Sequence, residues 1–213
     1  MKKLLIAVLL MFGLISCSDE EVKPSPTPQE QIRTKESFAK YVGAGVSYDV
    51  NDRGVLIFEK PRQMFANFND YRESEKELVF VSENPLSVRI SKKVQKGDKM
   101  AKQYSEIAFV YAIYRTFMNT SADLITVESY PIEISAKGKE KPLKQFTLKA
   151  TVSRDKALNV LKQYTDANSF DDLIQLKENK EYRTIGVDGS ELWDKFIYND
   201  RIRPDVVQSL MNN

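Results

Sequence analysis

The sequence predicts an α+β fold in which a largely antiparallel sheet, built from hairpins, packs against a central buried helix (about residues 100–118) and C-terminal helices. Two observations support this class. Segments of alternating apolar and polar residues come in pairs joined by turn residues, which is typical of antiparallel hairpins. Helical segments lie between these pairs without regular strand–helix alternation, which disfavours a parallel α/β sheet. We expect one globular domain over residues 32–213.

Each expected element follows from a local pattern: period-2 alternation for strands, 3.6-residue spacing for helices, and turn or capping residues at the boundaries. The first half of the chain is expected to contain a helix at 34–42, a hairpin of 46–50 and 55–58, a helix after Pro61, and a hairpin of 78–83 and 86–90. The central helix follows, and then strands at 125–134 and 146–152. The C-terminal part is expected to contain a helix capped by Ser153, a short helix with a Ser169–Asp172 capping box, a strand at 182–187, and helices around Trp193 and after Pro204.

Two of these elements have unusual patterns. Apolar residues surround most of the central helix, so we expect it to be buried on more than one side. The strand at 125–134 changes parity, since Ile125 and Val127 lie on the opposite phase from Ile132. Pro131 follows this change, and we therefore expect a bulge or an edge position there.

The first residues have the composition of an export signal. Two lysines precede an apolar run from Leu4 to Ile15, which at 12 residues is shorter than the roughly 20 that a bilayer core requires. The tetrad Leu14-Ile15-Ser16-Cys17 resembles the lipobox of bacterial lipoproteins, in which the cysteine becomes the lipidated first residue. This resemblance implies a signal peptide at 1–16 and a lipid anchor on Cys17. The alternative is an ordinary cleaved signal peptide with an incidental cysteine.

The residues after Cys17 are acidic and then rich in proline. Ser18, Asp19, Glu20 and Glu21 resemble the acidic export signal that directs lipoproteins of the Bacteroidota to the outer face of the outer membrane. This resemblance implies a domain facing the cell surface, and without such a signal the domain would face the periplasm. Residues 17–31 contain few large apolar side chains, so we expect a disordered tether.

Composition disfavours several function classes. The chain has no histidine and a single cysteine, which excludes Ser-His-Asp and Cys-His catalysis, His-ligated zinc and an internal disulfide. Without Lys2 and Lys3, the 32 basic residues become 30 and equal the 30 acidic residues. A neutral mature chain disfavours nucleic acid as a partner. We expect no metal, no cofactor and no catalytic residue.

Three short motifs suggest chemistry but have simpler explanations. Residues 37–40 and 153–156 both match the Ser-x-x-Lys pattern of penicillin-recognising enzymes, yet no Lys-Thr-Gly follows, and helix capping explains Ser153. Residues 49–54 resemble the start of an EF-hand loop, but Arg53 occupies a ligand position. A hairpin turn is the better prediction there.

Carboxylates for sugar hydrolysis are present, but that chemistry needs two of them facing each other across a cleft. The candidates are Glu128, Glu133, Asp188, Glu191 and Asp194. Lysine-rich stretches at 92–102 and 137–144 are expected in solvated connections. If these two stretches met in space, they would form a basic rim suited to an anionic glycan or a phosphate-bearing lipid.

The sequence therefore predicts a non-catalytic lipoprotein, anchored to the outer membrane by lipid, that binds a protein or glycan partner or serves an envelope assembly. Two alternatives remain open at this point. One is a carboxylate-based glycan hydrolase, and the other is an envelope-protective or immunity lipoprotein. A cleft with two acidic residues would favour the hydrolase, whereas a broad apolar patch would favour a macromolecular partner.

The substitution Cys17→Ala should move the protein from the membrane fraction to the soluble fraction, because stable anchoring depends on more than one acyl chain. Fractionation of cells followed by immunoblotting measures this, and Ser18→Ala serves as a control that leaves the cysteine in place. Retention of the Cys17→Ala variant in the membrane fraction would contradict lipid anchoring through this residue.

Overall fold

The computed structural model describes residues 33–178 and 183–212. The expected signal peptide, Cys17, the acidic segment Ser18–Glu21 and the tether lie outside the described residues. Within the described ranges, no helix is both long enough and apolar enough to cross a bilayer. The domain is mixed α+β, as the sequence predicts.

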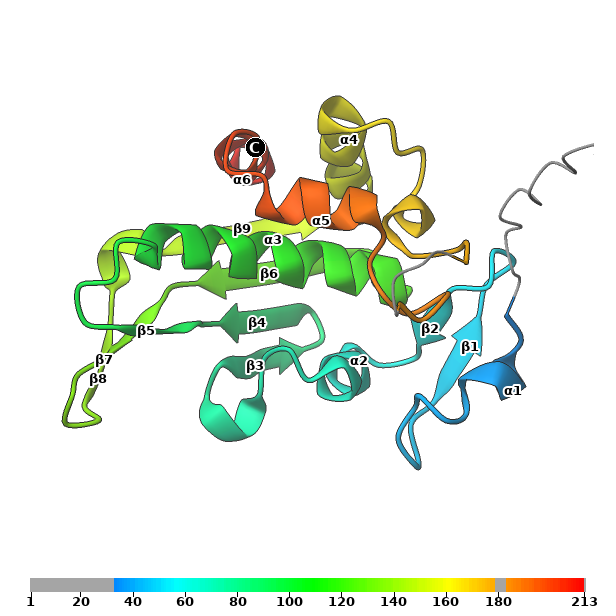
Figure 1. Ribbon diagram of the computed structural model, residues 1–213, viewed down its shortest axis with the longest axis horizontal. Helices are drawn as coiled ribbons and strands as arrows, with labels where there is room; N and C mark the ends of the chain where they lie inside the picture. Colours follow the sequence, from blue (N-terminus) through cyan, green and yellow to red (C-terminus); the bar gives the residue numbers. More distant parts are fainter. Residues whose placement is uncertain (1–32, 179–182, 213) are drawn as a thin grey trace, which may run out of the picture.

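A four-stranded sheet in the order β3-β4-β6-β9 forms the centre of the domain (Figure 1). The strands are β3 (Leu78–Glu83), β4 (Leu86–Ile90), β6 (Leu124–Ser129) and β9 (Leu148–Ser153). β3 and β4 form the expected hairpin, with Leu78 opposite Ile90, and β9 pairs antiparallel with β6. The central pair, β4 with β6, is parallel. Parallel neighbours need a long crossover connection, and here the helix α3 provides it.

The second sheet, in the order β5-β7-β8, extends from the first. Its strands are β5 (Lys93–Gln95), β7 (Ile132–Ile134) and β8 (Glu140–Pro142). β5 and β7 follow closely after β4 and β6 and repeat their parallel pairing. Four of the six strand pairings in the described ranges are nevertheless antiparallel, so the largely antiparallel character is confirmed.

The prediction of a bulge or an edge position at Pro131 is wrong. β6 ends at Ser129, and the chain resumes pairing at Ile132 as the central strand of the second sheet. The amide of Ile132 donates to the carbonyl of Lys92 at 2.9 Å, which joins the two parallel pairs across the break. The parity change in the sequence thus marks the passage of the chain from one sheet to another.

α3 (Ala101–Asn119) lies at the centre of the hydrophobic core, and every residue from Ala108 to Asn119 is buried. This confirms the predicted burial on more than one side. Sheet strands and C-terminal helices both contact α3. These helices are α4 (Arg154–Tyr164), α5 (Glu191–Tyr198) and α6 (Arg203–Met211). Ser153 caps α4 as predicted, since its Oγ accepts from the amide of Lys156 at 3.2 Å.

The N-terminal part also follows the prediction, with a shorter first helix. Its elements are α1 (Lys35–Phe38), β1 (Tyr48–Val50), β2 (Leu56–Phe58), α2 (Pro61–Phe68) and the 3-10 turn η1 (Glu73–Glu75). β1 and β2 pair antiparallel across the predicted turn. α1 and the β1–β2 hairpin lie at one end of the long axis, and the second sheet lies at the other end (Figure 1).

Two further predictions need correction. Phe146 belongs to the 3-10 turn η2 (Lys144–Phe146), so β9 begins only at Leu148. The strand expected at 182–187 is a turn over its described residues, because the amides of Val187 and Asp188 both donate to the carbonyl of Thr184. The predicted capping box at Ser169 is confirmed, although it begins the 3-10 helix η3 (Phe170–Leu173) in place of an α-helix.

Candidate functional site

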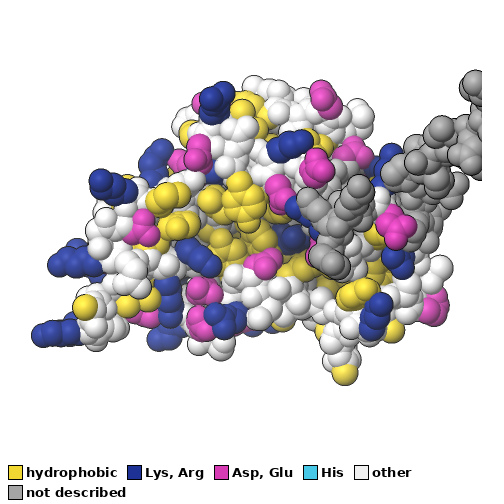
Figure 2. Space-filling view, viewed as in Figure 1, with side chains coloured by type: hydrophobic (Ala, Val, Ile, Leu, Met, Phe, Trp, Pro, Cys, Tyr) yellow, Lys and Arg dark blue, Asp and Glu magenta, His cyan; other side chains and the backbone are white. Residues whose placement is uncertain are grey.

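A cleft of about 430 Å³ opens beside α3 and α5. In Figure 2, hydrophobic side chains, a class that includes tyrosine, gather in the middle of this face over these helices, with charged side chains around them. We call this hollow the aromatic cleft. Its lining combines aromatic rings, three basic side chains and three carboxylates, and these come from four separate parts of the chain.

Four aromatic side chains line the aromatic cleft: Tyr71, Tyr111, Trp193 and Tyr198. The ring centroid of Tyr111 lies 5.1 Å from that of Tyr71 and 6.3 Å from that of Trp193, so these three rings are in contact. Tyr198 extends the aromatic surface into solvent, with 58% of its surface exposed. Flat apolar groups, and the C–H faces of sugar rings, can stack on such surfaces.

Arg115, which projects from the buried part of α3, lines the aromatic cleft with only 6% of its surface exposed. Its guanidinium carbon lies 4.3 Å from the ring centroid of Phe68 and 5.5 Å from that of Trp193. One nitrogen, Nη1, donates to the Asn119 side chain and to the carbonyl of Val187, both at 3.3 Å. Nε is buried without an acceptor. In residues 33–178 and 183–212, no carboxylate forms an ion pair with Arg115.

The three carboxylates of the cleft each have a donor from the protein. Asp70 accepts from the Tyr111 hydroxyl at 2.7 Å, and Asp188 accepts from the amide of Thr184. Asp194 pairs with Arg183. In contrast, Lys92 lies 5.6 Å above the Tyr71 ring and has no ion pair with a described residue. The cleft therefore presents two positive charges, Arg115 and Lys92, that lack an acidic partner in the described part of the chain.

The tyrosine hydroxyls of the cleft are held in their neutral form. Burial raises the pKa of Tyr71 and Tyr111, and the nearby carboxylate of Asp70 raises both further. For Tyr198, burial and the charge of Asp194 raise the pKa. At neutral pH these phenols carry their protons, so they act as hydrogen-bonding groups and not as bases.

The five carboxylates considered for the alternative glycan hydrolase are dispersed, except for one pair. Asp188 and Asp194 both line the aromatic cleft. Glu191 pairs with Lys195 on the surface of α5, and Glu133 accepts from the amide of Gly97 in the second sheet. Glu128 pairs with Arg89 and Lys144 on the first sheet. No group of three or more acidic or cysteine side chains suited to a metal ion occurs among the described residues.

The other chemical motifs have structural roles. The hydroxyl of Ser37 donates to the carbonyl of Thr34, and Ser153 caps α4, so neither serine is placed as a nucleophile. Arg115 belongs to no motif that would mark it in the sequence as a functional residue. The available signal was an arginine within the continuous apolar pattern of the central helix, because a buried charge in such a position needs a compensating partner.

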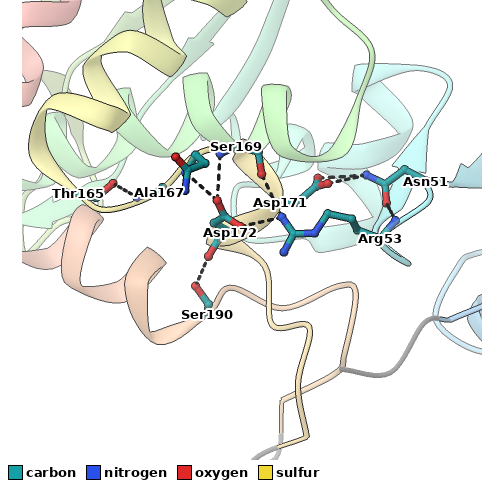
Figure 3. A network of polar contacts seen from close by, with 9 residues as sticks. Asn51, Arg53, Thr165, Ala167, Ser169, Asp171, Asp172 and Ser190 are labelled. Carbon is teal, nitrogen blue, oxygen red and sulfur yellow. Dashed lines mark hydrogen bonds and ion pairs between the residues drawn. The ribbon is translucent and has the colours of Figure 1, made fainter. Parts of the chain in front are cut away.

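A second polar cluster joins the β1–β2 turn to η3 (Figure 3). The Asn51 side chain donates to Asp171, and Arg53 pairs with Asp172 at 2.7 Å. Burial raises the pKa of Asp171. Burial by itself would also raise the pKa of Asp172. Hydrogen bonds from Arg53 and from the amides of Asn168 and Ser169 outweigh this effect and hold the pKa of Asp172 below its usual value.

Opposite pKa shifts in neighbouring carboxylates are a feature of some acid–base pairs. Here the oxygens of both Asp171 and Asp172 accept from protein donors. Asn51 also closes its own turn by accepting from the amides of Arg53 and Val55. This cluster therefore has a structural role, because it connects two segments that are distant in sequence. The hairpin turn predicted at 49–54 is confirmed.

The aromatic cleft depends on close packing between Gly189 and the indole of Trp193. A Cβ at position 189 would lie 2.0 Å from Trp193 Cδ1. Gly189→Ala should displace the indole, shift its fluorescence to longer wavelength and lower the free energy of unfolding by about 1–3 kcal/mol. Gly43→Ala, whose Cβ would meet Val46 at an ordinary 3.7 Å, is the matched control. An unchanged emission spectrum of Gly189→Ala would contradict this packing.

Asp172→Ala should lower the free energy of unfolding at pH 7 by about 1–2 kcal/mol, because the capping box and the ion pair with Arg53 are both lost. Since the pKa of Asp172 is lowered in the folded state, its stabilisation is present above about pH 4 and is lost as the pH falls through the lowered value. Urea unfolding at pH 7 and pH 3 measures this, with the exposed Asp52→Ala as control. A difference from wild type that persists unchanged at pH 3 would oppose the assignment.

Comparison of the chain with known proteins finds no matching family model, no matching curated protein and no matching solved structure. Similarity therefore assigns no function, and the physical character of the aromatic cleft is the basis for one.

Proposed function

We propose that this chain is a lipid-anchored protein of the bacterial envelope whose domain is a binding module without catalytic activity. We further propose that the aromatic cleft binds a sugar unit carrying an anionic group, such as a uronic acid, within an envelope or environmental glycan. The lipid anchor is supported by the lipobox-like segment ending at Cys17, and display at the cell surface by the acidic residues Ser18–Glu21.

The buried Arg115 carries this proposal. Removing a cation from water costs several kcal/mol unless an anion or hydrogen bonds compensate. Aromatic faces and two oxygens compensate Arg115 in part, but no described carboxylate neutralises it. A carboxylate from a ligand would supply the missing charge and form strong, charge-assisted hydrogen bonds with guanidinium.

The surroundings of Arg115 favour a sugar over a simple anion. Tyr71, Tyr111 and Trp193 offer ring faces, and Tyr198 extends them to the rim. The neutral phenols can donate to or accept from sugar hydroxyls. A cleft of about 430 Å³ is of the size found for small-molecule sites. Two other hollows, beside Gln175 and beside Tyr48, contain no buried charged side chain.

A glycan hydrolase is the second candidate, because Asp188 and Asp194 line the same cleft. The binding role is preferred since both carboxylates already accept from protein donors, Thr184 and Arg183. A general acid or base needs a group that is available to the substrate. Release of reducing ends from an acidic polysaccharide, abolished by Asp194→Asn, would establish the hydrolase instead.

The single tryptophan provides a direct test, because Trp193 lines the aromatic cleft. Galacturonate should change its fluorescence in a saturable manner, whereas galactose, which lacks the carboxylate, should bind at least about tenfold more weakly, reflecting one lost charge-assisted contact. Titration of the full chain carrying Cys17→Ala measures both. Equal responses to the two sugars, or no response to either, would contradict the proposed ligand class.

Variants separate cleft binding from a general change in the protein. Tyr198→Ala should weaken binding of galacturonate about tenfold through loss of a stacking surface. Tyr41→Ala, another exposed tyrosine outside the cleft, should leave binding unchanged. Arg115→Gln should remove the preference for galacturonate over galactose, and thermal unfolding of this variant shows whether the buried site tolerates the change.

A further inference from the structure

The two lysine-rich stretches of the sequence meet in the second sheet. The first contains β5 and the second contains β8, and both strands flank β7. The amide of Gly97, in the turn after β5, donates to Glu133 on β7 at 3.4 Å, which holds this turn against the sheet. Figure 2 shows basic side chains projecting from this end of the molecule.

Five lysines at this end are exposed and have no ion pair with a described residue. We call them the lysine cluster: Lys96, Lys99, Lys137, Lys139 and Lys141. The neighbouring acidic side chains have other partners. Glu140 pairs with Lys93 at 3.0 Å, and Asp98 accepts from the amide of Met100 at 2.8 Å. The lysine cluster is therefore a local positive surface on a chain that is close to neutral.

Lys92 connects the lysine cluster to the aromatic cleft. It lines the cleft, and β5 begins at the next residue. From Lys92 to Lys96 the chain rises about 3.3 Å per residue, so the distance along the strand is about 13 Å. Lys92 and Lys96, which have no ion pair with a described residue, thus lie just before and just after β5, and Lys93 between them is paired with Glu140.

From the short distance between the cleft and these lysines we infer that the lysine cluster is a second binding site for the same ligand, an extended polysaccharide with repeated anionic groups. This inference rests on the proposed function. One acidic sugar occupies the aromatic cleft, and neighbouring units of the chain follow Lys92 and β5 to the lysine cluster. Solvated lysines favour a polymer with regular negative charges, because each contact is weak and several act together.

The structure favours a polysaccharide over an anionic membrane surface. The turn that carries Lys137 and Lys139 contains Ala136 and Gly138 but no large apolar side chain to insert between headgroups.

The test compares polygalacturonate with galacturonate on the full chain carrying Cys17→Ala. The variant Lys137→Gln/Lys139→Gln/Lys141→Gln should bind polygalacturonate about tenfold more weakly at low salt, with a shallower dependence on salt concentration. Its affinity for galacturonate should match that of the protein with these lysines intact. The matched control, Lys40→Gln/Lys149→Gln/Lys162→Gln, removes the same charge from exposed positions elsewhere and should bind polygalacturonate normally.

The outcomes distinguish this inference from the proposed function. If galacturonate binds but the two triple variants bind polygalacturonate equally, the lysine cluster is not a glycan site and the proposed function stands. If neither ligand binds, the proposed function fails and this inference fails with it. Binding to phosphatidylglycerol vesicles that is lost in the lysine-cluster variant, without any effect of that variant on polygalacturonate, would assign the cluster to a membrane surface and overturn the inference.

Discussion

The burial of α3 from Ala108 to Asn119 governs how the rest of the structure packs around this helix. Polar side chains on such a buried stretch must find hydrogen-bond partners inside the protein. Tyr114 donates to the carbonyl of Ala157 on α4, and Asn119 donates to the carbonyl of Leu56 on β2. Near the other end, Glu106 pairs with the buried Arg203 of α6. These contacts connect the central helix to elements from both ends of the chain.

Arg115 departs from this pattern, and the proposed site depends on this departure. Its position on α3 places a cation among aromatic rings, at the junction of α2, α5 and the loop that contains Val187. The contacts present leave one buried nitrogen without an acceptor. Natural cores retain few such groups, and each needs an explanation; for Arg115 the explanation we propose is an anionic ligand. The burial of α3 therefore underlies both the organisation of the core and the proposed anion site.

The distribution of charge matters more here than its total. The net charge of the chain is close to zero, and this disfavours nucleic acid as a partner. The fold nevertheless gathers lysines from two separate stretches at one end of the domain and leaves two further cations in the aromatic cleft. A local field depends on which charges lie close together and on which are already paired. Net charge alone does not reveal such a surface.

Local sequence patterns were sufficient to predict the elements that depend on interactions between near neighbours in the chain. The 78–90 hairpin, the buried central helix and the caps at Ser153 and Ser169 follow from alternation, helical spacing and side-chain–backbone hydrogen bonds between near neighbours. Three features became visible only in the folded structure. They are the parallel pairing of β4 with β6, the passage of the chain between sheets at Pro131, and the proximity of Tyr71, Arg115 and Trp193 in one cleft. These features join residues that are distant in sequence. Their formation depends on how the whole core packs around α3, which no local pattern encodes.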